Sequence, residues 1–252
     1  MGEPLVHPQF NQFIGVCRQK KVKVNLTTNG TLLNSENTLS LLDPIVSQVN
    51  FSLQSFDSNF PGKNNKIYLE KIFYFAEQAL LQRPDLYLNF RLWNLGSENE
   101  INNTAIIDKI EKRFNVSVNK KTDVRRKKSI KVKERIYLHF DSRFKWPNPY
   151  DPIRSESGFC HGLSSHIGVL ADGTIVPCCL DKEGNIALGN CTQSKIENIV
   201  DSERPKLMVQ GFAQGKLVED FCQRCTFISR FDSKLKKLGN RCVNPSDIVV
   251  IT

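Results

Sequence analysis

The 252-residue chain is 40% hydrophobic and 24% charged, which allows one sizeable core, or one core with a smaller satellite domain. Its net charge of +9 is concentrated in one place: residues 120–135 hold nine basic and two acidic residues, and the rest of the chain sums to only +2. No run approaches the roughly 20 apolar residues of a membrane span, and the first residues lack the pattern of a secretory signal. We therefore expect a cytoplasmic protein, in which grouped cysteines indicate metal or redox chemistry before they indicate disulfides.

Strand-like and helix-like patterns alternate through the first two-thirds of the chain. Helical spacing of apolar residues over 7–20 is followed by a strand at 22–28, which ends at the turn signal Asn29-Gly30. The same alternation then predicts, in chain order, a helix at 38–43, a strand at 49–55, a helix at 66–82, a strand at 86–93, a helix at 101–114 and a strand at 135–140. This rhythm predicts an α/β fold with a mostly parallel sheet and helices on its outer face.

Polar residues occupy the C-terminal ends of all four predicted strands. Ligands of mostly parallel sheets bind at that edge of the sheet, because the loops that follow the strands meet there. The candidate stretches are 27–29, 54–57, 91–94 and 139–141. Polar strand ends predict a ligand site at this edge without identifying the ligand.

The composition changes in the last third of the chain. Residues 146–156 are rich in Pro, Ser and Asp and are typical of a linker. Beyond them, two apolar runs flank Asp172-Gly173, which is a hairpin signature. Ser194 and Glu197 predict a capping box at the start of a helix. The predicted organisation is a domain at 1–145, a linker at 146–156 and a smaller domain at 157–252.

Four cysteines in the smaller domain form two separated pairs. Cys160 precedes the hairpin and Cys178 closes it, so the hairpin can bring them together. Cys222 and Cys225 form a C-x-x-C, a turn that presents two thiolates to one centre. Four thiolates in two pairs satisfy either an iron–sulfur cluster or a tetrahedral zinc ion. The spacing therefore predicts metal or cluster binding and leaves the choice between the two open.

The other cysteines are not predicted to be ligands. Cys17 lies on an apolar helix face and is interpreted as a small core residue. Cys179 follows Cys178 directly, so in a strand it should point the opposite way. Cys191 and Cys242 are interpreted as free thiols or as groups surrounding the centre. Two nearby histidines are interpreted as ordinary loop or hairpin residues: His161 and His166.

The cysteine-rich region resembles the twitch/SPASM extension of radical S-adenosylmethionine enzymes. The shared pattern is a cysteine, twelve residues, Gly173, four residues and a second cysteine, followed by Leu-Gly-Asn at 188–190, a helix and a C-x-x-C. No closely spaced cysteines follow until Cys242, so the resemblance implies the shorter twitch form with one auxiliary [4Fe–4S] cluster. The ligands that the resemblance implies are Cys160, Cys178, Cys222 and Cys225.

The first domain resembles the radical S-adenosylmethionine domain from its second strand onwards. Residues 2–8 (GEPLVHP) resemble the family's Gly-Gly-Glu-Pro motif, in which Glu3 would meet the ammonium of the methionyl group, and residues 26–33 (LTTNGTLL) resemble its third strand and turn. The resemblance implies a partial (β/α) barrel over 1–145 that lacks its first strands. It also implies a cofactor site for S-adenosylmethionine formed by Gly2, Glu3, Pro4, Asn29, Ser52, Gln54 and Arg91.

The family's catalytic-cluster motif, C-x-x-x-C-x-x-C, does not occur in the sequence. We therefore expect an N-terminally truncated chain that binds an auxiliary cluster and part of the cofactor without cleaving S-adenosylmethionine by itself. The resemblance implies hydrogen-atom abstraction by a 5′-deoxyadenosyl radical on an unknown substrate, either a peptide or a small molecule. It further implies an electron donor such as a flavodoxin or a ferredoxin.

Two alternative functions follow from the same residues. A four-cysteine zinc module used for structure or interaction shares these spacings. A nucleic-acid-binding protein could use the basic segment 120–135 to contact phosphates. That segment has no interleaved aromatic residues for stacking, and its place between a helix and a strand is typical of a solvated loop. A nucleic-acid partner is therefore not expected, and neither is a membrane.

Overall fold

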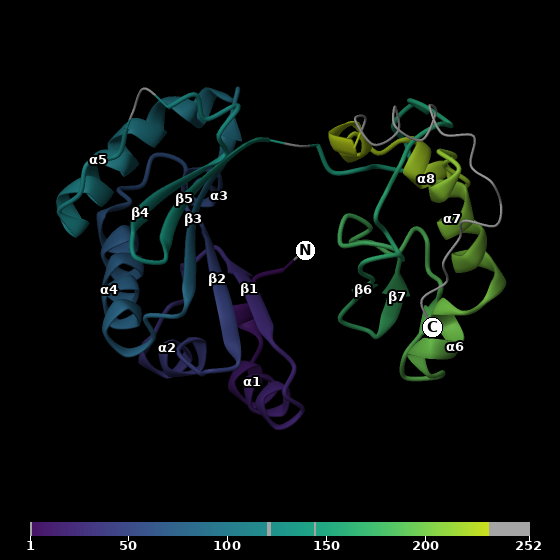
Figure 1. Cartoon of the computed structure of the whole chain (residues 1–252), viewed down its shortest axis with the longest axis horizontal. Helices are drawn as coiled ribbons and strands as arrows, with labels where there is room; N and C mark the ends of the chain where they lie inside the picture. The colour runs from purple at the N-terminus through teal and green to yellow at the C-terminus, as the bar shows by residue number, and fades with distance from the viewer. Residues whose placement is uncertain (1, 120–121, 144, 232–252) are drawn as a thin grey trace. The chain divides into compact units, whose positions relative to one another are not determined.

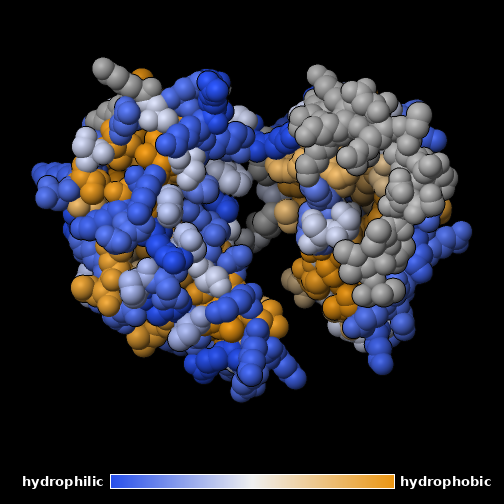
Figure 2. Space-filling model, viewed as in Figure 1, coloured by the Kyte–Doolittle hydropathy of each residue, from blue (hydrophilic) through white to orange (hydrophobic). Residues whose placement is uncertain are grey.

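The computed structural model of the protein describes residues 2–119, 122–143 and 145–231. It divides into two compact units, Met1–Arg143 (unit 1) and Phe144–Thr252 (unit 2) (Figure 1). Within the described residues, no helix has both the length and the apolar character to cross a bilayer. On the face shown in Figure 2, hydrophilic residues are interspersed with scattered apolar patches.

Unit 1 is built on a five-stranded sheet. Its strands are β1 (Val24–Thr28), β2 (Val46–Ser52), β3 (Tyr87–Leu95), β4 (Ser129–Lys133) and β5 (Ile136–Ser142). The order across the sheet is β1-β2-β3-β5-β4; the first four run parallel, and β4 pairs with β5 antiparallel. The mostly parallel α/β sheet predicted from the alternation is therefore confirmed.

Helices connect these strands and cover one face of the sheet, where α4 and α5 run beside it in Figure 1. The helical segments of unit 1 are η1 (Pro4–Val6), α1 (Phe10–Gln19), α2 (Ser35–Leu41), α3 (Ser55–Asn59), α4 (Lys66–Gln82), η2 (Glu98–Ile101) and α5 (Asn102–Phe114). Helix α4 has the predicted bounds because Arg83-Pro84 stops it. Gly30 has a φ of +74°, and a Cβ there would lie 2.8 Å from Ile72, so the turn after β1 needs glycine.

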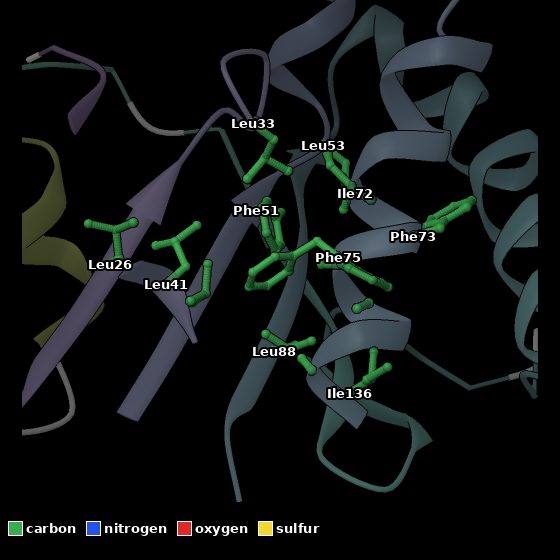
Figure 3. Packing of buried hydrophobic residues seen from close by; sticks show 14 of the residues in the cluster. Leu26, Leu33, Leu41, Phe51, Leu53, Ile72, Phe73, Phe75, Leu88 and Ile136 are labelled. Atoms are coloured by element: carbon green, nitrogen blue, oxygen red, sulfur yellow. The ribbon is translucent and has the colours of Figure 1, made fainter. Parts of the chain in front are cut away.

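The core of unit 1 lies between the sheet and these helices. Phe51 is fully buried, and its ring centroid lies 5.5 Å from that of Phe75 on α4 and 6.3 Å from that of Phe90 on β3 (Figure 3). Leu88 and Ile136 continue the same buried layer along β3 and β5. Because side chains alternate along a strand, the intervening residues lie on the opposite face of the sheet.

That opposite face, called the inner face below, is polar across all five strands. Its members include Thr27, Gln48, Asn50, Ser52, Asn89, Arg91, Trp93, Ser129, Lys131, Tyr137 and His139. Asn50 is at its centre: its Oδ1 accepts hydrogen bonds from Gln48 and Asn89, both at 2.8 Å, and its Nδ2 donates to the Leu26 carbonyl at 2.9 Å. The inner face therefore presents fixed polar groups, which suits a polar ligand.

Unit 2 is small and contains a three-stranded sheet. Its elements are β6 (Gly168–Val169), β7 (Thr174–Val176), β8 (Gly189–Asn190), α6 (Ile196–Val200), α7 (Glu203–Ala213), α8 (Asp220–Gln223) and η3 (Phe227–Phe231). The predicted hairpin is confirmed, since β6 pairs with β7 and Gly173 has a φ of +85° in the turn between them. A separate apolar cluster stabilises the unit, with Met208 and Phe212 of α7 at its centre.

Two local predictions are wrong. The helix after β8 is capped at Lys195, which makes no side-chain capping bond, so Ser194 and Glu197 do not form a capping box. The backbone N–H of Ser194 instead donates to the Asn190 carbonyl in the preceding turn.

The basic segment was predicted to be a solvated loop, yet residues 129–133 form strand β4. The reason is that Val132 is buried and Ile130 packs partly against the core of unit 1. Two apolar side chains at alternate positions on one face are sufficient to hold this charged segment on the sheet.

Candidate metal centre and strand-end site

Four thiols of unit 2 come from three separate parts of the chain. Cys160 precedes the β6–β7 hairpin, Cys178 follows β7, and Cys222 and Cys225 lie in and just after α8. Cys225 is buried and the other three are partly buried. Thiolates at Cys178, Cys160 and Cys225 would repel a negative charge on Cys222. A thiolate at Cys160 would likewise repel a negative charge on Cys225. The four predicted ligands therefore lie within electrostatic range of one another in unit 2.

The surroundings of these four cysteines oppose the thiolate charge that each would carry as a ligand. Burial raises the pKa of Cys178 to about 12, with a smaller contribution from the neighbouring thiols Cys160 and Cys179. Burial, followed by repulsion from the neighbouring cysteines, also raises the pKa of Cys222. Burial raises the pKa values of Cys160 and Cys225. A bound metal centre would reverse this balance, because metal ligation requires thiolates.

Backbone N–H groups point at three of the four sulfurs. Gly162 N donates to Cys160 Sγ at 3.4 Å. The N–H groups of Leu180 and Asp181 lower the pKa of Cys178, and those of Phe227 and Ile228 act in the same way on Cys225. Such donors stabilise thiolate charge, and hydrogen bonds to the sulfurs are among the determinants of iron–sulfur potentials. The donor set fits a [4Fe–4S] cluster, in which four cysteine thiolates hold the irons.

Within the residues that the structure describes, no three His, Cys, Asp or Glu side chains are arranged closely enough to hold a single metal ion.

Asp181 organises the loop that follows Cys178. This carboxylate is fully buried and accepts three hydrogen bonds, from Asn185 N (2.7 Å), Asn185 Nδ2 (2.9 Å) and Ile186 N (2.7 Å). Its own N–H donates to the Cys178 carbonyl at 3.2 Å and points at the Cys178 sulfur. Sequence analysis missed Asp181; the available signal was an Asp followed by Glu183-Gly184-Asn185, a composition typical of a turn.

The other four cysteines are not among the predicted ligands. Cys17 is a buried member of the unit 1 core, as predicted. Cys179 is exposed. The Cys191 sulfur lies at the hairpin turn, 3.3 Å from where a Cβ on Gly173 would be. Cys242 lies outside the described residues.

In unit 1, Glu3 ties the start of the chain to the end of β1. Its Oε1 accepts hydrogen bonds from Thr28 Oγ1 (2.6 Å) and Leu5 N (3.2 Å), and its Oε2 accepts one from Asn29 N (2.7 Å). Pro4 begins η1, as its fixed φ favours at a first helical position, and Gly2 is exposed. Three of the predicted cofactor residues therefore form one turn against the strand end.

Asn29 stabilises the loop after β1. Its side-chain oxygen accepts from Thr31 N (2.9 Å) and Thr31 Oγ1 (2.6 Å), and its carbonyl accepts from the Tyr68 hydroxyl (2.7 Å). Burial, and then the charge of Glu3, raise the pKa of Tyr68, so this hydroxyl stays protonated and remains a donor. Because the side-chain oxygen of Asn29 already accepts hydrogen bonds within the loop, its side-chain amide nitrogen is the group that can donate to a ligand.

Arg91 is a cation that forms no ion pair with any residue that the structure describes. Its guanidinium lies 4.4 Å from the Trp93 ring centroid, and Nη1 donates to Thr27 Oγ1 at 3.3 Å. Its Nε is buried and has no hydrogen-bond partner, and no described acidic group forms an ion pair with it. Burial lowers the pKa of Arg91 accordingly. An unpaired, half-buried guanidinium is expected to bind an anion, because desolvated charge is costly unless paired.

The other predicted cofactor residues lie beside Arg91. Ser52 is its register partner on β2, and Leu53 N donates to the Arg91 carbonyl at 3.1 Å. Gln54, which follows, has a buried Oε1 without a hydrogen-bond partner. Two buried polar atoms without partners at neighbouring strand ends indicate a ligand that completes their hydrogen bonding.

His139 is the register partner of Arg91 on β5. Its Nε2 lies 3.2 Å from Ser129 Oγ, and burial, followed by the charge of Arg91, lowers its pKa. Sequence analysis noted polar residues at 139–141 but did not place His139 in the site. The missing information was the sheet order, which puts β5 directly beside β3.

The lowered pKa of His139 predicts a loss of stability in mild acid. In the unfolded protein the His139 imidazole binds a proton near its ordinary pKa of about 6.5, whereas in the folded protein it binds one only at a lower pH. The free energy of unfolding should therefore fall as the pH drops from about 7 through the folded pKa. Urea unfolding across this range should show a shallower pH dependence for His139→Gln than for the unaltered protein. His7→Gln, at an exposed histidine, is the matched control, and equal slopes for all three proteins would contradict the prediction.

Comparisons with family models and with solved structures each found matches. Residues 160–226 match the SPASM family model, an iron–sulfur cluster-binding domain, and this range contains all four candidate ligands. The crystal structure of SuiB from Streptococcus suis is similar over 83% of this chain and 55% of SuiB, with 16% identity and a TM-score of 0.51. The structure of SuiB bound to S-adenosylmethionine matches over 89% of this chain and 58% of SuiB, with 14% identity and a TM-score of 0.46.

The chain thus spans about half the length of SuiB. The first of these likenesses shows a shared fold, and the predicted α/β fold, followed along the chain by a cysteine-rich SPASM domain, is confirmed. No curated protein matches the sequence.

Proposed function

We propose that this chain, which joins the α/β fold of radical S-adenosylmethionine enzymes to a SPASM iron–sulfur domain, binds one auxiliary [4Fe–4S] cluster and S-adenosylmethionine. The observation that carries the proposal is the convergence of Cys160, Cys178, Cys222 and Cys225 within the matched domain. The likeness to SuiB, which has been crystallised with S-adenosylmethionine, supports the choice of cofactor for unit 1 only as a fold-level analogy.

The residues of unit 2 would hold and stabilise the cluster. When bound, the cluster would supply one-electron redox chemistry. The four thiolates would ligate its irons, and the N–H groups of Gly162, Leu180 and Phe227 would offset part of the negative charge on the sulfurs. Asp181 would keep the loop after Cys178 in the shape that aims the N–H groups of Leu180 and Asp181 at the Cys178 sulfur.

The residues of unit 1 would bind the methionyl end of the cofactor. Arg91 would pair with the carboxylate, because it is a half-buried cation to which no described residue supplies a counter-ion. Glu3, together with the turn formed by Gly2 and Pro4, would meet the ammonium group. Ser52, Gln54 and Asn29 would supply the neutral hydrogen-bonding groups around it.

The reaction proposed is the chemistry of the family, hydrogen-atom abstraction by a 5′-deoxyadenosyl radical. Its substrate would be a peptide or a small molecule, and its electron donor a flavodoxin or a ferredoxin. The 252 residues contain no C-x-x-x-C-x-x-C motif. The functions proposed for these residues are therefore cofactor binding and auxiliary-cluster binding, and the proposal does not extend to cleavage of the cofactor.

Titration calorimetry with S-adenosylmethionine tests the cofactor site. Arg91→Met should weaken binding by roughly tenfold to a hundredfold, because a hydrogen bond to a charged group contributes about 1.5–3 kcal/mol. Decarboxylated S-adenosylmethionine should bind the unaltered protein and Arg91→Met equally, since it lacks the group that Arg91 would hold. Arg18→Met, which removes an exposed arginine paired with Asp43, is the matched control.

Two results would count against the proposal. If Arg91→Met weakens binding of both ligands equally, Arg91 does not contact the carboxylate. If the unaltered chain binds neither ligand and purifies with zinc and no iron, the alternative four-cysteine zinc module is favoured.

A further inference from the structure

Strand β4 has one edge that no described strand covers. It is the last strand in the sheet order, and its one neighbour is β5. An uncovered edge offers a row of backbone N–H and C=O groups to any extended chain that can approach it.

The hydrogen-bond register identifies which groups face outward. Phe140 N donates to the Lys128 carbonyl at 2.8 Å, and Ile130 lies opposite Leu138. In an antiparallel ladder the hydrogen-bonded and non-hydrogen-bonded pairs alternate, so the backbone groups of Lys128 and Ile130 face β5. Those of Ser129 and Lys131 face the uncovered edge.

This edge is strongly basic. Residues 123–135 contain seven basic and two acidic residues. Lys128 pairs with Asp141 at 2.9 Å, and Arg125 lies 4.0 Å from Glu100. Lys131 and Lys133 are exposed, and neither forms an ion pair with a described residue. Within the part of the chain that the structure describes, no acidic group therefore compensates the positive charge on β4 itself.

We propose that β4 is a docking edge for an extended acidic peptide segment, which pairs with the outward-facing backbone groups of Ser129 and Lys131. Lysines on an edge strand oppose pairing with a second copy of the same strand, because like charges face each other. The same lysines attract a strand of opposite charge. Addition of a strand to a sheet edge is an established mode of peptide recognition.

Such a peptide would extend the inner face by one strand. Ser129 and Lys131 are inner-face residues in register with His139 and Tyr137. Alternate side chains of the added strand would therefore lie in the same rows as these residues and Arg91. The inference goes beyond the proposed function, and peptide docking at β4 requires neither the cluster nor S-adenosylmethionine.

Fluorescence anisotropy with a labelled Val-Glu-Val-Glu-Val-Glu-Val peptide tests the inference on the full chain. We expect binding that weakens with added salt. Lys131→Pro should weaken it roughly tenfold, because proline removes an outward-facing N–H and leaves the ladder to β5 intact. Lys131→Glu should weaken it to a similar extent by reversing the charge. Lys112→Glu, at an exposed position on α5, is the matched control and should bind like the unaltered protein.

A second probe separates backbone pairing from charge attraction without altering the protein. The same peptide with alternate backbone nitrogens methylated should bind at least tenfold more weakly, since it cannot pair as a strand. The inference is overturned if the methylated peptide binds equally well, if neither peptide binds, or if a single-stranded DNA of equal charge displaces the peptide and binds Lys131→Pro unchanged. Because both peptides bind the unaltered chain, this comparison stands even if Lys131→Pro disturbs folding.

Discussion

Anaerobically reconstituted protein should contain about four irons per chain, and Cys178→Ala or Cys225→Ala should lose most of that iron. The four thiols converge in unit 2, so removing one leaves three ligands and exposes the cluster to hydrolysis and exchange. This effect should be among the largest of any single substitution outside the core, because ligand binding and domain folding are coupled at such centres.

Iron and sulfide analysis, together with the visible absorbance of the reconstituted protein, provides the measurement. Cys179→Ala is the closest matched control, because this exposed cysteine is adjacent to Cys178 in the chain. It should keep the full iron content. Retention of all iron after removal of both Cys222 and Cys225 would show that the ligand assignment is wrong.

Asp181→Ala should lower the free energy of unfolding of the reconstituted protein by about 3 kcal/mol or more, since the buried N–H of Ile186 and two part-buried N–H groups of Asn185 lose their acceptor. It should also reduce iron retention, because the loop that aims two N–H groups at Cys178 would relax. The adjacent core would loosen with it, as Ile186 is almost fully buried.

Urea unfolding and iron content, measured on the same samples, test this prediction. Asp172→Ala is the matched control: this exposed carboxylate also accepts from a nearby backbone N–H, in the hairpin turn. Asp172→Ala should change neither the free energy of unfolding nor the iron content much. An Asp181→Ala protein that unfolds like the unaltered one and keeps its iron would show that Asp181 does not organise the centre.

Much of the architecture follows from local patterns in the sequence. The strand and helix periods of unit 1 predicted its mostly parallel sheet, because each period matches one backbone geometry and one buried face. The Asp172-Gly173 pair predicted the hairpin of unit 2, since Gly173 adopts the left-handed conformation that this turn requires. The cysteine spacing predicted four ligands; this stays a prediction, and the structure places the four thiols within electrostatic range of one another.

Other features depended on contacts between residues far apart in the chain. Strand β4 was missed because the seven basic residues of 123–135 dominate the local composition, whereas its place on the sheet depends on Val132 reaching the core of unit 1. The absence of a counter-ion for Arg91 among the described residues could not be deduced from sequence, since it depends on which acidic groups lie nearby.

The sequence by itself determined the elements, the hairpin and the identity of the candidate ligands, because each depends on residues that are close together in the chain or on thiolate chemistry. Only the tertiary structure decided that Asp181 supports Cys178, that His139 lies beside Arg91 and that β4 presents a basic edge. These features depend on strand order and burial, which arise when distant segments pack together and which no local period encodes.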